Sequence, residues 1–359
     1  MSPLPGFGAI VPAGGAGKRL WPVSQARRPK FLLDLTGAGR SLIQQTWDRL
    51  VPLAGAEGVA VVTGAAHAAA VRRQLPGLAA RNLITEPCPR DSMPAIALAA
   101  AIAHQRQGDA VLGSFAADHV IGHQAAFERA VEAAYQAARE DLIATIGVAP
   151  AGPSTAYGYI KAGPPLGLAA APEARLVEAF KEKPDLSTAA GYLQAGYRWN
   201  AGMFVFRAGL LLERLHALQP ALAQGIEALA RAWDTPQRGE VAARVWPTLP
   251  RVAIDHAIAE PVAAQGGLAT VPGDFPWSDL GDFDSLAALA PDGGLRLAGG
   301  PAPVLVDSPG ALVVNQTRQQ VALLGLPDAV VALSDGVVLV TTRANAQRVK
   351  QLADQLDRA

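Results

Sequence analysis

A glycine-rich segment near the amino terminus carries the most distinctive chemistry in the chain. Glycines let backbone N–H groups turn toward an anion, so Gly14, Gly15 and Gly17 predict a cradle for a phosphate chain. The basic residues of this region lie within thirteen positions and precede every acidic residue of the chain: Lys18, Arg19, Arg27, Arg28 and Lys30. On glycine spacing alone, a tight turn followed by a solvated basic face is the simpler interpretation.

Two common phosphate-binding loops do not fit this segment. A Walker A loop requires glycine five positions before its Gly-Lys pair and Ser or Thr after that pair, whereas Pro12 and Arg19 stand there. A dinucleotide-binding loop would place its third glycine near Leu20, with an acidic residue about twenty positions further on. The sequence therefore excludes both of these loop types.

Short strand-like runs alternate with helical runs through most of the chain. This pattern predicts an α/β fold with a mostly parallel twisted sheet and helices on both faces, similar to a Rossmann fold. Asp91 or Ser92 is the expected N-cap of the third helix. The expected strands are 7–11, 59–63, 83–86, 110–115 and 142–148, and the expected helices are 41–51, 65–75, 94–105 and 124–139.

Two regions depart from this alternation. Residues 157–205 are less regular, and we expect them to form an insertion that covers the carboxyl edge of the sheet. After residue 290 the composition shifts toward Gly, Pro and Val, with short strand-like runs and then a helix from residue 344. The sequence therefore predicts a large domain over 1–290 and a small β-rich C-terminal domain with a closing helix over 291–359.

The charge balance argues against polyanionic partners. Lys plus Arg and Asp plus Glu each total 31, so no overall basic field exists to attract nucleic acid or an anionic membrane. The single cysteine, Cys88, excludes an intrachain disulfide, and no signal peptide or membrane-spanning run is evident. We expect a cytoplasmic protein with no nucleic-acid or membrane partner.

The full signature segment resembles that of a known enzyme family. From Gly14 to Ser24, with Pro29-Lys30-Phe31-Leu32 following, it is similar to the nucleotidyltransferases that make sugar nucleotides, the sugar-nucleotide pyrophosphorylases. Trp21-Pro22 followed by Ser24 indicates the GDP-mannose branch, which joins GTP to mannose 1-phosphate. Further segments of the family occur in the same order within residues 7–290: AADH at 116–119, YGYI at 157–160, FKEKP at 180–184, WNAGMF at 199–204 and WSDLG at 277–281.

The resemblance implies how the phosphates are handled. Arg19 and Lys30 are expected to bind the triphosphate and the leaving pyrophosphate, and Lys183 the sugar phosphate. Asp118 and Asp279 match the family's metal-binding carboxylates and are expected to hold Mg²⁺. Taken alone, each aspartate would be a strand-end or turn residue and each lysine a solvated one.

The resemblance and one physical argument assign the recognition residues. Gly158, Glu182 and Asn200 resemble the residues that contact the sugar. Glu86, at the end of a predicted strand, has two acceptor oxygens that match the adjacent N1–H and N2–H₂ donors of guanine. Alternatively, Glu86 only ends the strand and backbone groups read the base. The expected nucleotide-binding residues are Gly14, Gly15, Gly17, Lys18 and Glu86.

Departures from the family pattern leave the substrates open. Gln25 stands where the branch usually has Arg, Phe31-Leu32-Leu33 lacks the usual Gln, and residues 257–261 lack a familiar Lys after Glu. Alternatives are a transferase for glucose or heptose phosphate with a different base, and a catalytically silent paralogue that senses nucleotide sugars. We expect the transferase activity alone, without an isomerase domain, and a homodimer is an open alternative to a monomer.

Overall fold

The computed structural model describes residues 3–15, 17–290, 293–296, 301–334 and 336–356, and the chain divides into two compact units. The first unit comprises Met1–Gly14, Trp47–Ala116 and Ile121–Trp277, and the second comprises Gly15–Thr46, Ala117–Val120 and Ser278–Ala359. Most of the signature segment thus groups with the C-terminal region. The predicted boundary at residue 290 stays a sequence-based prediction, because the units follow packing rather than chain order.

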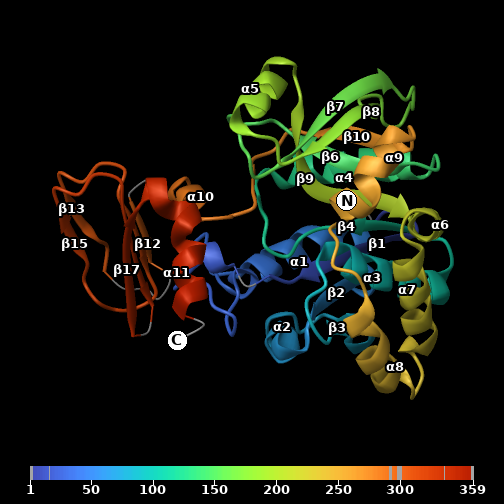
Figure 1. The fold of residues 1–359 in the computed structure, drawn as a ribbon, viewed down its shortest axis with the longest axis horizontal. Coiled ribbons are helices and arrows are strands. Elements are labelled where there is room, and N and C mark those ends of the chain that lie inside the picture. Colours follow the sequence, from blue (N-terminus) through green and yellow to red (C-terminus); the bar gives the residue numbers. More distant parts are fainter. Residues whose placement is uncertain (1–2, 16, 291–292, 297–300, 335, 357–359) are drawn as a thin grey trace. The chain divides into compact units, whose positions relative to one another are not determined.

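A nine-stranded sheet forms the centre of the first unit within the described residues (Figure 1). Six of its strands, together with β7, run in one direction, whereas β8 and β9 run in the opposite direction. The sheet order is β3 (Leu83–Glu86), β2 (Val59–Gly64), β1 (Phe7–Ala13), β4 (Val111–Ser114), β9 (Arg198–Arg207), β6 (Ile143–Val148), β10 (Leu268–Gly273), β8 (Arg175–Glu182) and β7 (Gly158–Pro165).

The region expected to be an insertion is instead part of this sheet. Strand β9 lies between β4 and β6 and pairs antiparallel with both, and β7 and β8 form the far edge. The reason is hydrophobic burial. Met203, Phe204, Val205 and Phe206 are all at most 1% exposed, so β9 is a core strand and not a surface cover.

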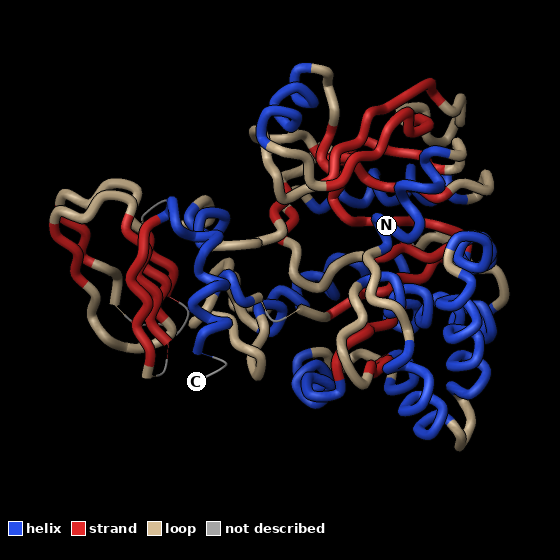
Figure 2. The backbone as a smooth tube through the Cα atoms, in the orientation of Figure 1, coloured by secondary structure: helices blue, strands red, loops and turns tan. Residues whose placement is uncertain are grey.

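Helices surround this sheet, as Figure 2 shows. Helix α3 begins after the N-cap Asp91, whose side chain accepts a hydrogen bond from the backbone N–H of Ser92, and it is apolar on nearly all sides. Its buried residues share one core with α6 and α7. The helices are α1 (Leu42–Ala54), α2 (Ala68–Gln74), α3 (Ser92–Gln107), α4 (Gln124–Ala138), α5 (Leu186–Gln194), α6 (Ala208–Leu218), α7 (Pro220–Trp233), α8 (Arg238–Val245) and α9 (Glu260–Ala264).

The second unit has a β-rich part and its own core. One sheet has the order β12 (Gly294–Arg296), β14 (Leu312–Asn315), β16 (Ala329–Ser334) and β17 (Val337–Thr342), and a second joins β13 (Val304–Val306) to β15 (Ala322–Leu324). Helix α10 (Phe283–Ala287), a 3-10 segment (Arg343–Arg348) and helix α11 (Val349–Leu356) complete it. Its core includes Leu20, Leu280, Phe283, Val330 and Val349, which explains why distant segments form one unit.

Short elements complete the described chain. Strands β5 (Val120–Ile121) and β11 (Trp277–Ser278) lie where the chain passes between the units. The predicted C-terminal β domain with its closing helix is confirmed, and the early strands and helices lie within a few residues of their predicted bounds. No helix among the described residues combines the length and the apolar character needed to cross a bilayer.

Candidate active site

The glycine loop has a backbone that requires glycine at two of its described positions. Gly15 has φ 88° and Gly17 has φ 57°, values that other residues adopt only with strain. A Cβ at Gly17 would also lie 2.6 Å from Ser24 Oγ and 3.5 Å from Lys30 Cγ. Ala16 lies outside the described residues. The loop then enters a 3-10 turn, Lys18–Leu20, which presents two cations.

Lys30 joins the two aspartates predicted to bind metal, all within the second unit. Its Nζ lies 3.0 Å from Asp118 Oδ2 and donates to the backbone carbonyl oxygen of Asp279 at 2.5 Å. The side chains of Lys30 and Asp118 are only 13% and 18% exposed, so solvent screens this pair weakly. Three segments far apart in the sequence therefore place one cation and two carboxylates in one region.

The donor set at this point fits Mg²⁺. No cluster of three or more His, Cys, Asp or Glu side chains of metal-binding geometry occurs in the part of the chain that the structure describes. Mg²⁺ does not need one, because it commonly takes one or two carboxylates together with substrate phosphate oxygens. Asp118 and Asp279 would supply that pair.

Two further cations of the signature segment, Lys18 and Arg19, contact the C-terminal segment of the second unit. Arg19 Nη1 donates to Gln347 Oε1 at 3.0 Å, and Lys18 Nζ lies 2.6 Å from Asp354 Oδ1. Sequence analysis identified neither partner. Asp354 is 336 residues from Lys18, and nothing in a local pattern signals such a pair.

Glu86 is a buried carboxylate with spare hydrogen-bonding capacity in the first unit. It ends β3, is 8% exposed, and its Oε2 has no hydrogen-bond partner among the described residues. Burial raises the pKa of Glu86 to about 7. A Cβ at Gly14 would lie 3.8 Å from Glu86 Oε1, so the structure places this carboxylate beside the start of the glycine loop. An unpaired buried acceptor is costly unless a ligand satisfies it.

Gly158 and Glu182 are partners across β7 and β8 in the first unit. Gly158 pairs in register with Glu182, and a Cβ at Gly158 would overlap Glu182 Oε2 and lie 3.3 Å from Asn200 Cβ. Glycine is thus needed for this carboxylate to approach the strand. Glu182 Oε1 forms an ion pair with Lys183 Nζ, whereas its buried Oε2 has no partner within the described chain.

The amide of Asn200 is oriented by protein groups on both sides. Its Oδ1 accepts from Thr145 Oγ1 at 2.9 Å and from the backbone N–H of Gly202 at 3.1 Å, while its Nδ2 donates to Asp255 Oδ1 at 2.8 Å. One N–H of Nδ2 is left to donate elsewhere. Asn200 therefore offers a donor, and Glu182 offers an acceptor.

Asp255 is a residue that sequence analysis missed. It begins a π-helical turn, Asp255–Ala259, a feature often found at functional sites. Burial and then the nearby charge of Glu182 raise the pKa of Asp255 to about 6. The signal in the sequence was an acidic residue within a mostly apolar run. The structure buries the apolar residues of this run, Ile254 and Ala257–Ala259. A charge in such a run requires a partner.

Aromatic rings pack beside these recognition residues. The Tyr157 ring lies 4.8 Å from that of Trp199 and 5.2 Å from that of Trp277, centroid to centroid. These two tryptophans therefore pack against a common tyrosine ring.

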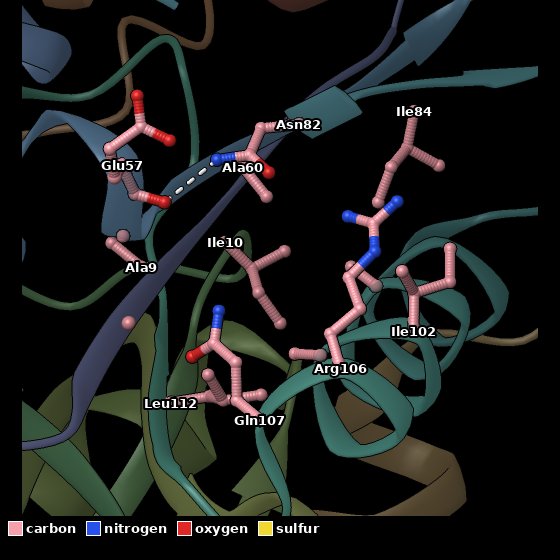
Figure 3. A pocket seen from close by; sticks show the side chains of 14 residues that line it. Ala9, Ile10, Glu57, Ala60, Asn82, Ile84, Ile102, Arg106, Gln107 and Leu112 are labelled. Atoms are coloured by element: carbon pink, nitrogen blue, oxygen red, sulfur yellow. Dashed lines mark hydrogen bonds between the residues drawn. The ribbon is translucent and has the colours of Figure 1, made fainter. Parts of the chain in front are cut away.

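A separate small cavity lies beside strands β1, β2, β3 and β4 (Figure 3). It is lined by residues including Ile10, Ala60, Leu112 and Arg106, and Asn82 Nδ2 donates to the Glu57 carbonyl oxygen at its wall. Its volume of about 30 Å³ is room for about one water molecule. It is too small to be a substrate site, and the candidate residues lie elsewhere.

Comparison with known families agrees with this arrangement of motifs. Residues 8–293 match the family model described as nucleotidyl transferase. The chain belongs to the nucleotidyl transferase family. Residues 302–356 of this nucleotidyltransferase also match the MannoseP isomerase/GMP-like beta-helix domain.

Individual relatives of this nucleotidyltransferase align with nearly the whole of its chain. The xanthan biosynthesis protein XanB of Xanthomonas campestris pv. campestris (strain B100) is 38% identical over 357 residues, which are 98% of this chain and 73% of the relative. Mannose-1-phosphate guanylyltransferase of Escherichia coli is 35% identical over 97% of this chain and 73% of its own length.

A solved structure leads to the same conclusion. The crystal structure described as mannose-1-phosphate geranyltransferase from Thermus thermophilus has a TM-score of 0.84 and 30% identity, and covers 98% of this chain and 99% of that one. The predicted family, fold class and enzyme class are confirmed.

Proposed function

We propose that this nucleotidyltransferase is a Mg²⁺-dependent mannose-1-phosphate guanylyltransferase, which forms GDP-mannose and pyrophosphate from GTP and α-D-mannose 1-phosphate. Relatives that carry this name align over 97% of the chain, which supports the choice of substrates. The structural observation that carries the proposal is Lys30 bound to Asp118 and to the Asp279 backbone, since such a cation–carboxylate group suits reacting phosphates.

The proposed reaction is a direct displacement. A phosphate oxygen of mannose 1-phosphate attacks the α-phosphorus of GTP, the bond from that phosphorus to the α–β bridging oxygen breaks, and pyrophosphate leaves with the electron pair. The nucleophile needs no general base, because a phosphate monoester has a second pKa of about 6 and is largely dianionic at neutral pH. Catalysis then consists of positioning and charge neutralisation.

Each basic residue of the site binds a particular phosphate group in this proposal. Arg19 and Lys30 bind the triphosphate and the leaving pyrophosphate, and Lys183 binds the sugar phosphate. Mg²⁺ held by Asp118 and Asp279 supplies further charge neutralisation when bound. Gly14, Gly15, Gly17 and Lys18 add backbone and side-chain donors to the nucleotide phosphates.

Hydrogen-bonding groups of the first unit select the base and the sugar. Burial raises the pKa of Glu86 to about 7, and the N1–H and N2–H₂ donors of guanine favour the ionised form, which accepts from both. This use would satisfy its buried unpaired oxygen. Glu182 accepts from a sugar hydroxyl through Oε2, and the remaining N–H of Asn200 donates to another. The Gly158 backbone lies beside both side chains. Asp255 keeps Asn200 in its donating orientation.

A substrate panel tests the proposal. Pyrophosphate release is measured for GTP, ATP, UTP and dTTP, each with mannose, glucose and heptose 1-phosphates in the presence of Mg²⁺. The highest kcat/KM is expected for GTP with mannose 1-phosphate. A higher value for another pair would replace the assigned substrates, and no release from any pair would support a silent sensor of nucleotide sugars.

A further inference from the structure

The C-terminal helical segment of the second unit reaches the signature cations. Gln347, in the 3-10 turn Arg343–Arg348, accepts from Arg19 Nη1 at 3.0 Å, and Asp354 of α11 pairs with Lys18 at 2.6 Å. Ala346 and Val349 are 2% and 4% exposed and belong to the same core as Leu20. Their burial fixes the backbone on both sides of Gln347.

The amide of Gln347 is held at both of its ends. Its oxygen faces the Arg19 guanidinium, which has only donors, and its Nε2 donates to the carboxylate of Asp282, which has only acceptors when ionised. Asp282 is itself 9% exposed and caps α10 by accepting from the backbone N–H of Ser285 at 2.9 Å. Gln347 therefore has one orientation that satisfies both neighbours.

This bridge links Arg19 to the turn that carries Asp279. A Cβ at Gly281 would lie 3.3 Å from Arg19 Nη2 and 3.0 Å from Asp279 Oδ2, so the guanidinium lies against that turn while Gln347 holds its other terminal nitrogen. The Gln347 side chain is itself exposed, so it is the contact at both ends of its amide, rather than burial, that holds the guanidinium.

We infer that Gln347 is a positioning residue, which holds the Arg19 guanidinium in the orientation that binds the nucleotide triphosphate. This inference rests on the proposed function and extends it to the C-terminal domain. A free arginine side chain samples many rotamers, and a bridge to Asp282 removes most of them before the nucleotide binds. The β-rich domain thus supplies a group that acts on the phosphate site through Arg19.

A double-mutant cycle tests this role. Gln347→Met removes both hydrogen bonds at similar volume, and the exposed Gln351 on α11 provides the matched control Gln351→Met. Gln347→Met is expected to lower kcat/KM for GTP about tenfold or more, with the KM for mannose 1-phosphate and the Tm close to those of the control. In an Arg19→Ala background, Gln347→Met should cost less than about twofold.

Two outcomes overturn the inference. One is an unchanged kcat/KM for GTP in Gln347→Met, and the other is a full loss that persists in the Arg19→Ala background, which would indicate a structural role. GTP affinity of the same variants by isothermal titration calorimetry gives the cycle without turnover. If wild-type protein binds GTP but releases no pyrophosphate with any sugar phosphate, the proposed function fails while the cycle still decides the role of Gln347.

Discussion

The candidate site residues of the two units of this nucleotidyltransferase differ in how their polar groups are satisfied. In the first unit, Glu86 and Glu182 each keep a buried carboxylate oxygen without a hydrogen-bond partner among the described residues. In the second unit, Lys30 is paired with Asp118, Lys18 with Asp354, and Arg19 with Gln347. The candidate site residues of the first unit thus include unsatisfied acceptor oxygens, whereas these three cations of the second unit already have ion-pair or hydrogen-bond partners.

This difference indicates how the two units divide substrate selection and phosphate chemistry. A dehydrated acceptor gains most from a ligand that brings a matching donor and loses most from one that does not, so it is suited to selecting neutral groups such as a base edge or a sugar hydroxyl. Cations near carboxylates are suited to highly charged phosphates. We therefore expect changes in the first unit to alter selectivity and changes in the second to alter rate.

The largest expected effect comes from the aspartates of the second unit. Asp118→Ala and Asp279→Ala should each lower kcat by roughly 10³-fold or more, because either change removes a carboxylate that holds Mg²⁺. Rates are measured over a range of Mg²⁺ concentrations. Asp284→Ala, which breaks a surface pair with Arg343, is the control and should retain activity. Full activity of either site variant at the same Mg²⁺ concentration would remove that aspartate from the mechanism.

A smaller and more selective effect is expected at Gly158. An alanine Cβ there would displace the Glu182 carboxylate, so Gly158→Ala should raise the KM for mannose 1-phosphate by about tenfold, with the KM for GTP changed by less than about twofold. Gly191→Ala, where a Cβ meets nothing within 4 Å, is the matched control. Equal increases in both KM values would contradict the sugar assignment of this pair.

The smallest effect concerns stability and pH. Burial raises the pKa of Asp255 to about 6, so its contribution to stability is present below about pH 4 and is lost as the pH rises through 6. Asp255→Asn stays neutral and should raise Tm relative to wild type at pH 8 by about 2 °C, and by less at pH 5. Differential scanning calorimetry measures both values. An equal shift at the two pH values would refute the role of this carboxyl.

The early sheet and the signature cations were predictable because their signals are local. Strand β3 has its predicted bounds, and Asp91 caps α3. Lys30 contacts Asp118 and the Asp279 backbone, and the roles of these residues stay predictions. The position of β9 between β4 and β6 could not be predicted, because an apolar run does not specify its neighbours in a sheet. Asp255 and Gln347 act through side chains 55 and 328 residues away, at distances where sequence spacing carries no geometry.

The division of labour is tested most directly by comparing base selectivity in two variants, Glu86→Gln and Lys30→Met. The kcat/KM ratio of GTP to UTP is measured for each variant and for wild type. In Glu86→Gln an amide donor would face guanine, so the ratio should fall by about tenfold or more. In Lys30→Met both efficiencies should fall together, and the ratio should stay within about twofold of wild type. An unchanged ratio in Glu86→Gln, or a changed ratio in Lys30→Met, would contradict the account.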